Sequence, residues 1–186
     1  RSRTVTTTFA STATELRGTR RLQVAELKQV EVVERRDAAE LLGVSLPDVV
    51  ASARAPVTFT YVLDLDGRWD FALAGRVVDV VAPPIAWNRP AVDVSKLEIR
   101  TVESSILRDE EPVVAELRAS LTGLLAQRAR RNVPLVRETA RREVEGFVRT
   151  WLLRAYGVPE DVRVVVRFRD EPGVDAPEAP VLPPRG

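Results

Sequence analysis

The chain has 186 residues, 45% hydrophobic and 30% charged, which is enough for one packed domain with a tail. Its formal net charge is +1, so no overall field attracts it to nucleic acid or to a membrane. It contains no Cys and no His, which excludes disulfides, thiolate nucleophiles and zinc sites, and histidine-based catalysis or metal binding.

The remaining composition is poor in residues that oxidise easily, because the chain also lacks Met. Lysine occurs only at Lys28 and Lys96, so arginine carries nearly all of the positive charge. This composition suits a thermophile, and a GC-rich genome explains it equally well. The chain holds no apolar run of about 18 residues, the length that a membrane-spanning helix needs.

Residues 1–20 are rich in Thr and predict an N-terminal lead that precedes the packed domain. Thr12 and Glu15 have the spacing of a helix capping box, and Gly18 is a common C-cap. The sequence therefore predicts a short helix at 12–17.

A long strand is expected at 22–34, where apolar residues alternate with polar ones. One face would carry Leu22, Val24, Val30 and Val32. The alternation slips at 26–28, which predicts a bulge there. The segment 36–55 is then expected to leave the sheet and form two short helices, at 38–42 and between Ser45 and Ala53.

The clearest alternation in the chain runs from position 57 to position 73. The apolar residues are all odd-numbered: Val57, Phe59, Tyr61, Leu63, Leu65, Trp69, Phe71 and Leu73. A period of two is typical of a half-buried strand, so these side chains are expected to share one buried face.

This alternation predicts a hairpin at 57–81 whose register depends on the length of its loop. A three-residue loop at 65–67 would pair Leu63 with Trp69 and Tyr61 with Phe71, which keeps the apolar residues on one face. Gly67 would then take the left-handed position of the turn.

A second apolar run, 77–81, is expected to form a strand that Pro83 and Pro84 end. Residues 87–90, Trp-Asn-Arg-Pro, would form a corner, and 92–102 would return to extended structure.

The stretches PPIAWNRPAVDVSKL and SSILRDEEPV, followed by two amphipathic helices, resemble the domain-of-unknown-function family numbered 4230. The resemblance spans about 22–168, and its clearest short match is 92–97, VDVSKL. Where the family shows a Gly before this motif, the chain has Ala91 and Val92. The resemblance implies a bacterial, extracytoplasmic domain that an N-terminal membrane helix often anchors. It implies no activity and brings no catalytic residues.

Two long helices are expected after Asp109, which is a good N-cap. The first would bury Val113, Leu117, Leu121, Leu124 and Leu125, and the second Val136, Ala140, Val144, Phe147, Val148, Trp151 and Leu152. Gly157 would end the second helix, and a final strand would run over 162–168.

The predicted fold is therefore α+β, with a mostly antiparallel sheet, the hairpin at 57–81, two covering C-terminal α-helices and the final strand 162–168. Residues 21–169 would form a single domain. The tail 170–186, which is rich in Pro, would be disordered.

Candidate interaction residues lie at two places in the sequence. Trp87, Asn88 and Arg89 form a Pro-bounded corner that could be a binding tip, although such a Trp more often covers a sheet edge. Arg128 and Arg131 stand in an Arg-rich helix end that could bind phosphates, although interleaved Glu residues favour a salt-bridged surface.

The sequence predicts no catalytic residue, no metal site and no cofactor. Asp64, Asp66 and Gly67 begin like a calcium loop, but Gly75 stands where its Glu should be. A carboxylate pair could come from Asp64, Asp70, Asp79 and Asp93, but no spacing singles out two of them.

Three functions follow from these patterns. The first, which rests on the family resemblance and the missing catalytic side chains, is a non-enzymatic extracytoplasmic scaffold or partner-binding domain, tethered to a membrane by a missing N-terminal anchor. The second is an Arg-helix module for anionic polymers or lipid head groups, with nucleic acid disfavoured by the net charge. The third is a carboxylate hydrolase. The heptad-like helices also permit homo-oligomers, and the protein partner stays unidentified.

Overall fold

The computed structural model describes residues 20–41, 44–103, 109–157 and 161–174. Its elements are β1 (Arg21–Asp37), β2 (Glu40–Leu41), β3 (Val44–Ser45), β4 (Val49–Asp64), β5 (Asp70–Ala74), β6 (Val77–Ala82), β7 (Ala86–Trp87), β8 (Ala91–Val92), a 3₁₀ turn (Val94–Lys96), β9 (Glu98–Glu103), α1 (Glu111–Arg131), α2 (Val133–Tyr156) and β10 (Arg163–Phe168).

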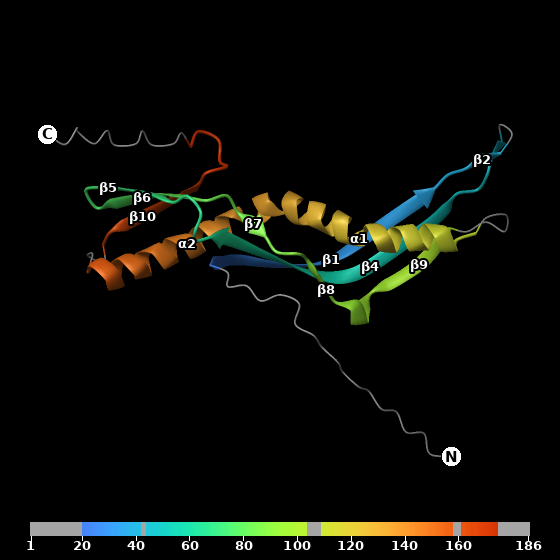
Figure 1. The fold of residues 1–186 in the computed structure, drawn as a ribbon, viewed down its shortest axis with the longest axis horizontal. Helices are drawn as coiled ribbons and strands as arrows, with labels where there is room; N and C mark the ends of the chain where they lie inside the picture. Colours follow the sequence, from blue (N-terminus) through green and yellow to red (C-terminus); the bar gives the residue numbers. More distant parts are fainter. Residues whose placement is uncertain (1–19, 42–43, 104–108, 158–160, 175–186) are drawn as a thin grey trace, which may run out of the picture.

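The larger sheet is built around β4, which pairs antiparallel with β1 along almost its whole length. The other edge of β4 is occupied in turn by β7, β8 and β9, all antiparallel. This long ribbon gives the molecule its elongated shape (Figure 1). The small β2–β3 hairpin joins β1 to β4 at one end.

The smaller sheet has the order β10-β6-β5. Strands β5 and β6 form an antiparallel hairpin, whereas β10 joins β6 in parallel. Helix α2 packs on β10 and also contacts β1, so it connects the two sheets. Helix α1 lies along β4 (Figure 1).

The core has two parts. The larger cluster joins β4, β6, β10 and α2, and its largest fully buried side chains are Phe59, Tyr61, Leu63 and Phe168. A smaller cluster lies between the first half of β4 and the start of α1, and includes Val49, Val113 and Leu117. Packing of an apolar helix stripe on a sheet face explains both.

The structure confirms the predicted α+β class, with a mostly antiparallel sheet, two helices and a final strand. The register predicted for the hairpin is wrong. Strand β4 does not pair with β5 in the described residues, and Phe71 lies opposite Val80 instead of Tyr61. The chain turns away after Asp64, because β4 already has β1 and β7 as neighbours at its end.

The left-handed position predicted for Gly67 is wrong, and Gly75 takes this conformation instead. Gly75, between β5 and β6, has φ +60°, while Gly67 does not have a positive φ. Gly67 is needed for a close approach, since a Cβ there would lie 2.9 Å from Cγ of Pro83 and 3.0 Å from the Asp64 carbonyl oxygen.

The strand predicted at 22–34 is confirmed, but its bulge lies between Gln23 and Ala25, earlier than expected. This shift of one residue reverses which side chains face the helices. Val30 and Val32 are consequently exposed, while Val33 packs on the smaller cluster.

The helices predicted at 38–42 and between Ser45 and Ala53 are wrong in the described part of this segment. Strand β1 continues to Asp37, opposite Val49, so β2 and β3 form only a short hairpin between the long strands. Tertiary pairing of β1 with β4 outweighs the local capping signals. The short helix predicted at 12–17 lies outside the described residues.

Both predicted α-helices are confirmed, and Gly157 ends α2 with φ +60°. Three expectations about burial in the helices are wrong: Leu124 is 36% exposed, and Phe147 and Trp151 are about two-fifths exposed. The predicted tail from position 170 begins with anchored residues, since Asp170 and Glu171 bind arginines of α2. Residues 175–186 lie outside the described part.

Candidate functional site

The corner predicted as a binding tip is largely a structural element. Trp87 lies in β7, paired with Tyr61 of β4, and its half-buried ring packs against the larger core cluster. The side-chain oxygen of Asn88 accepts a hydrogen bond from Arg21 at 3.2 Å. Arg89 is exposed. Trp87 therefore covers the sheet edge, the alternative that the sequence favoured.

The Arg-rich helix end is divided between structural and exposed arginines. Arg128 pairs with Glu31 of β1 at 3.2 Å, a carboxylate whose side chain is only 11% exposed. Arg131 is exposed and, with Gln127, Arg130 and Pro134, lines an open hollow of about 520 Å³. Within the described ranges no acidic side chain pairs with Arg130 or Arg131.

Arg137 and Arg141 of α2 hold the end of β10. Arg141 donates to Glu171 at 2.5 Å, and Arg137 donates to Asp170 at 2.9 Å. Both guanidinium groups lie over the ring of Phe168, at 5.8 and 5.5 Å from its centroid. These two arginines serve to fix α2 on the smaller sheet.

The pKa values in this arrangement reflect the pairing. Burial raises the pKa of Glu171, but the Arg141 guanidinium and the Phe168 backbone N–H, which both donate to the carboxylate, bring it below the usual range. The hydrogen bond to Glu171 raises the pKa of Arg141, against the opposing effect of burial. The pair thus stays ionised at neutral pH.

Of the four aspartates considered for acid–base chemistry, Asp64, Asp70 and Asp93 each have their own local hydrogen-bond or ion-pair partners. Asp70 is bound by Arg169 and Arg68, and the Arg169 hydrogen bond lowers its pKa. Asp93 accepts from Ser95, which lowers its pKa, and pairs with Lys96 at 3.4 Å. Asp64 accepts from the Asp66 backbone N–H in a turn. No group of three or more metal-ligating side chains occurs among the described residues.

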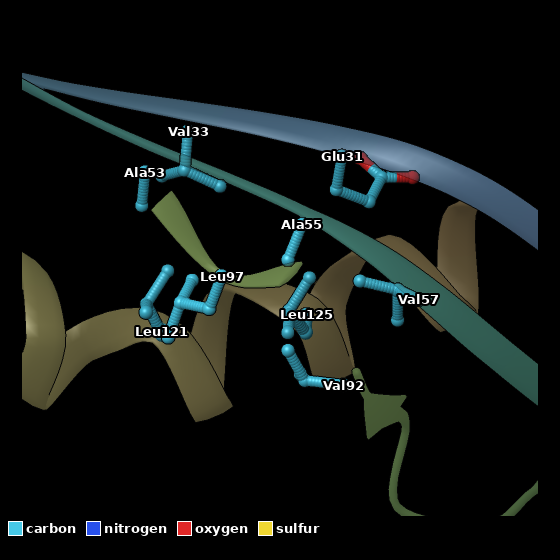
Figure 2. Close-up of a pocket in the computed structure, with 9 residues that line it drawn as sticks. All are labelled: Glu31, Val33, Ala53, Ala55, Val57, Val92, Leu97, Leu121 and Leu125. Carbon is cyan, nitrogen blue, oxygen red and sulfur yellow. The ribbon is translucent and has the colours of Figure 1, made fainter. Parts of the chain in front are cut away.

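A small cavity lies between the larger sheet and α1, lined mainly by Ala, Val and Leu (Figure 2). It encloses about 20 Å³, which is room for about one water molecule and too little for an organic ligand. Glu31 lies at its edge, where its carboxylate is bound by Arg128. This cavity is a packing defect beside Ala53 and Ala55, whose side chains leave space under Leu121 and Leu125.

The aromatic patch is an exposed apolar surface beside an open groove. We define it as Leu65, Trp69, Phe71, Leu73, Phe147, Trp151 and Tyr156. An open groove of about 440 Å³ runs between Trp69 and Phe71 on one side and Phe147 and Trp151 on the other. The patch contains five of the ten aromatic residues of the chain.

The rings of the patch contact one another in sequence. Trp69 and Phe71 stack with their centroids 6.2 Å apart, and Phe71 lies 5.7 Å from Trp151. Trp151 meets Tyr156 edge-on at 5.4 Å. Aromatic ring pairs favour offset-stacked and edge-to-face arrangements of this kind. Trp69 is further fixed because its indole N–H donates to the Asp64 carbonyl oxygen at 3.1 Å.

The patch exists because one helix is too narrow for the sheet beneath it. Val166, Val80 and Phe71 form one row across β10, β6 and β5, and their exposed fractions are 1%, 0% and 47%. An α-helix about 10 Å wide covers about two strands that are 4.8 Å apart. Helix α2 therefore covers β10 and β6 and leaves the third strand, β5, open.

Sequence reasoning placed all of the patch residues except Tyr156, on which it made no prediction, in the core, because their spacing is that of buried faces. The only signal of the patch was the apolar excess of the helices, which the sequence offered as a route to oligomers. No protein-family model matches the chain, and no curated protein or solved structure shows a significant match to it. In the part of the chain that the structure describes, no helix is long and apolar enough to cross a membrane.

Proposed function

We propose that the chain is a non-enzymatic interaction domain that binds through the aromatic patch. The observation that carries this proposal is a rigid, half-exposed set of aromatic rings around an open groove. Exposed apolar groups of this kind are stabilised when another surface removes them from water. Aromatic residues are also enriched in the centres of binding surfaces.

The chemistry of the chain supports a binding role over catalysis. The sequence supplies no His or Cys as a general base or nucleophile. Asp70 and Glu171 are bound by arginines that keep their pKa values low, which makes them poor general acids or bases at neutral pH. An extracytoplasmic, membrane-associated setting is part of the proposal and rests on the family resemblance.

The test measures, in cells of its source, how much of the 186-residue chain is free and how much is assembled with a partner. Phe71→Glu with Leu73→Glu should move the chain into the free fraction, because a charge at the patch opposes its burial. Val94→Glu is the matched control, since Val94 is 77% exposed and lies on the 3₁₀ turn, outside the patch. Equal distribution of the wild type and the patch variant would contradict the proposal.

A second candidate is binding of an anionic polymer at the hollow lined by Arg130 and Arg131. Its support is that both side chains are exposed and lack an acidic partner in the described ranges. Salt-sensitive binding to duplex DNA, weakened by Arg130→Gln with Arg131→Gln, would establish it. Absence of binding at low salt would end it.

A further inference from the structure

Two separate segments form one end of the elongated molecule. They are the β5–β6 hairpin, over 71–78, and the last two turns of α2, over 149–157. The contacts of Trp151 with Phe71 and with Tyr156 join them. Figure 1 shows the hairpin and the end of α2 at the same extremity. We call these two segments the apolar tip.

The side chains of the apolar tip project strongly into solvent. Leu73 is 71% exposed and Tyr156 is 68% exposed. Phe71 and Trp151 are also exposed, beside the groove. Several highly exposed apolar groups therefore stand together at this extremity.

The charged residues inside the two segments of the apolar tip are arginines, while Asp70 and the half-buried Asp79 flank the hairpin segment and Asp70 is bound by Arg68 and Arg169. The segment 71–78 contains Arg76 and no acid, and the segment 149–157 contains Arg149 and Arg154 and no acid. Arg163 follows beside the hairpin, where its N–H donates to the Arg76 carbonyl oxygen. Asp161 lies two residues before Arg163, and Arg76 pairs with it. Within the described ranges, Arg149, Arg154 and Arg163 have no acidic partner.

We propose that the apolar tip docks on the surface of an anionic lipid bilayer, with Leu73, Phe71, Trp151 and Tyr156 entering the head-group layer. This rests on the proposed function and names the surface that the patch binds. Trp and Tyr favour the membrane interface, where a ring is apolar and its polar edge stays hydrated. Long Arg side chains around them reach lipid phosphates.

The same features favour a bilayer over a protein groove. A projecting extremity with arginines on several sides fits a broad anionic plane. Each arginine near such a surface contributes to attraction, and insertion of the apolar side chains adds a component that salt does not screen. The net charge of +1 does not oppose this, because the attraction depends on the local charges of the tip.

The experiment is flotation of the purified chain with vesicles of phosphatidylglycerol and phosphatidylcholine, compared with phosphatidylcholine alone. Binding is expected to the acidic vesicles and to weaken with salt. Leu73→Glu should lower the partition coefficient about tenfold or more, because it inserts a charge at the most exposed apolar position of the apolar tip. Val94→Glu should leave it unchanged. Arg154→Gln should lower it about fivefold.

Tryptophan emission shows which residue enters the lipid. Quenching by lipids brominated near the head group should fall strongly in Trp151→Phe and little in Trp87→Phe, because Trp87 packs on the core away from the tip. Circular dichroism of each variant confirms that it is folded.

The outcomes separate the two proposals. Salt-dependent flotation with quenching of Trp151 supports the bilayer. A folded chain that does not float at low salt, or floats equally with Leu73→Glu, overturns the inference. If patch variants still shift the chain between cell fractions in that case, the patch binds a protein or a second copy, and the proposed function stands.

Discussion

Strands β4 and β5 carry the same pattern of apolar residues but differ in how far these residues are buried. Phe59 and Tyr61 of β4 are completely buried, whereas Phe71 and Leu73 of β5 are largely exposed. Helix α1 lies over β4, and the Tyr61 hydroxyl donates a hydrogen bond to the Ala129 carbonyl oxygen of α1. Strand β5 is the third strand of the smaller sheet, beside the two strands that α2 covers.

The difference shows that alternation predicts which side chains share a face but not whether that face is covered. Coverage depends on the number of strands and the width of the helix layer. In the smaller sheet, three strands meet one helix, and the row left over becomes the aromatic patch. In this fold the residues proposed to bind are apolar residues that the helix layer does not cover.

The largest expected effect compares Phe59 with Phe71. Phe59→Ala should lower the free energy of unfolding by about 3–5 kcal/mol, because it opens a cavity in the core. Phe71→Ala should lower it by less than about 1.5 kcal/mol, since its ring is 47% exposed. Urea denaturation of both variants measures the difference. Equal losses would mean that β5 is covered in solution.

The next effect concerns the link that fixes α2 over β10. Glu171→Gln should lower the free energy of unfolding by about 1–3 kcal/mol at pH 7, because Arg141 and the Phe168 N–H lose a charged acceptor. The pKa of Glu171 is lowered on folding from 4.5, so this contribution is present above that pH and disappears as the pH falls through the folded pKa.

Urea titrations of the wild type and Glu171→Gln at pH 7 and at about pH 3 test this pH dependence, because the difference between their free energies of unfolding should become smaller in acid. Glu138→Gln is the control. Glu138 also contacts Arg141, but its side chain is 75% exposed, so its loss should cost less than about 0.5 kcal/mol. A difference in free energy of unfolding that becomes larger in acid would exclude the proposed role of the Glu171 carboxylate.

A smaller effect compares the two tyrosines. Tyr61→Phe should cost about 0.5–1.5 kcal/mol, because the Ala129 carbonyl oxygen loses its 3.0 Å hydrogen bond from the hydroxyl. Burial raises the pKa of Tyr61, so the same hydroxyl should titrate above its ordinary value of 10 when absorbance is followed with pH. Tyr156→Phe should leave stability unchanged, and a comparable loss there would place Tyr156 in the core.

The smallest effect is expected at the apolar tip itself. Leu73→Glu should change the free energy of unfolding by less than about 0.5 kcal/mol, as is usual for an exposed surface position. Thermal denaturation measures it. A loss of several kcal/mol would show that Leu73 supports the fold, and its effect on binding would then need the tryptophan quenching as independent evidence.

Much of the fold could be predicted from local signals. Alternation identified β1, the second half of β4 and β10, an apolar run identified β6, and the helical spacing with Gly157 identified α1 and α2. The register of the hairpin could not be predicted, because Phe71 fits opposite Tyr61, its predicted partner, as well as it fits opposite Val80, its partner in the structure. The site was missed for the same reason: Trp69, Phe71 and Trp151 read as core residues.

The sequence alone determined the α+β class, the helices and most strands, because these depend on periodicity and end signals within short segments. It also excluded chemistry that needs His or Cys. Only the tertiary structure decided that β4 pairs with β1 and β7 to β9, that β5 turns into a second sheet, and that Phe71 and Trp151 remain in solvent. The physical reason is that burial depends on which layers meet and how wide they are, and a single segment does not contain that information.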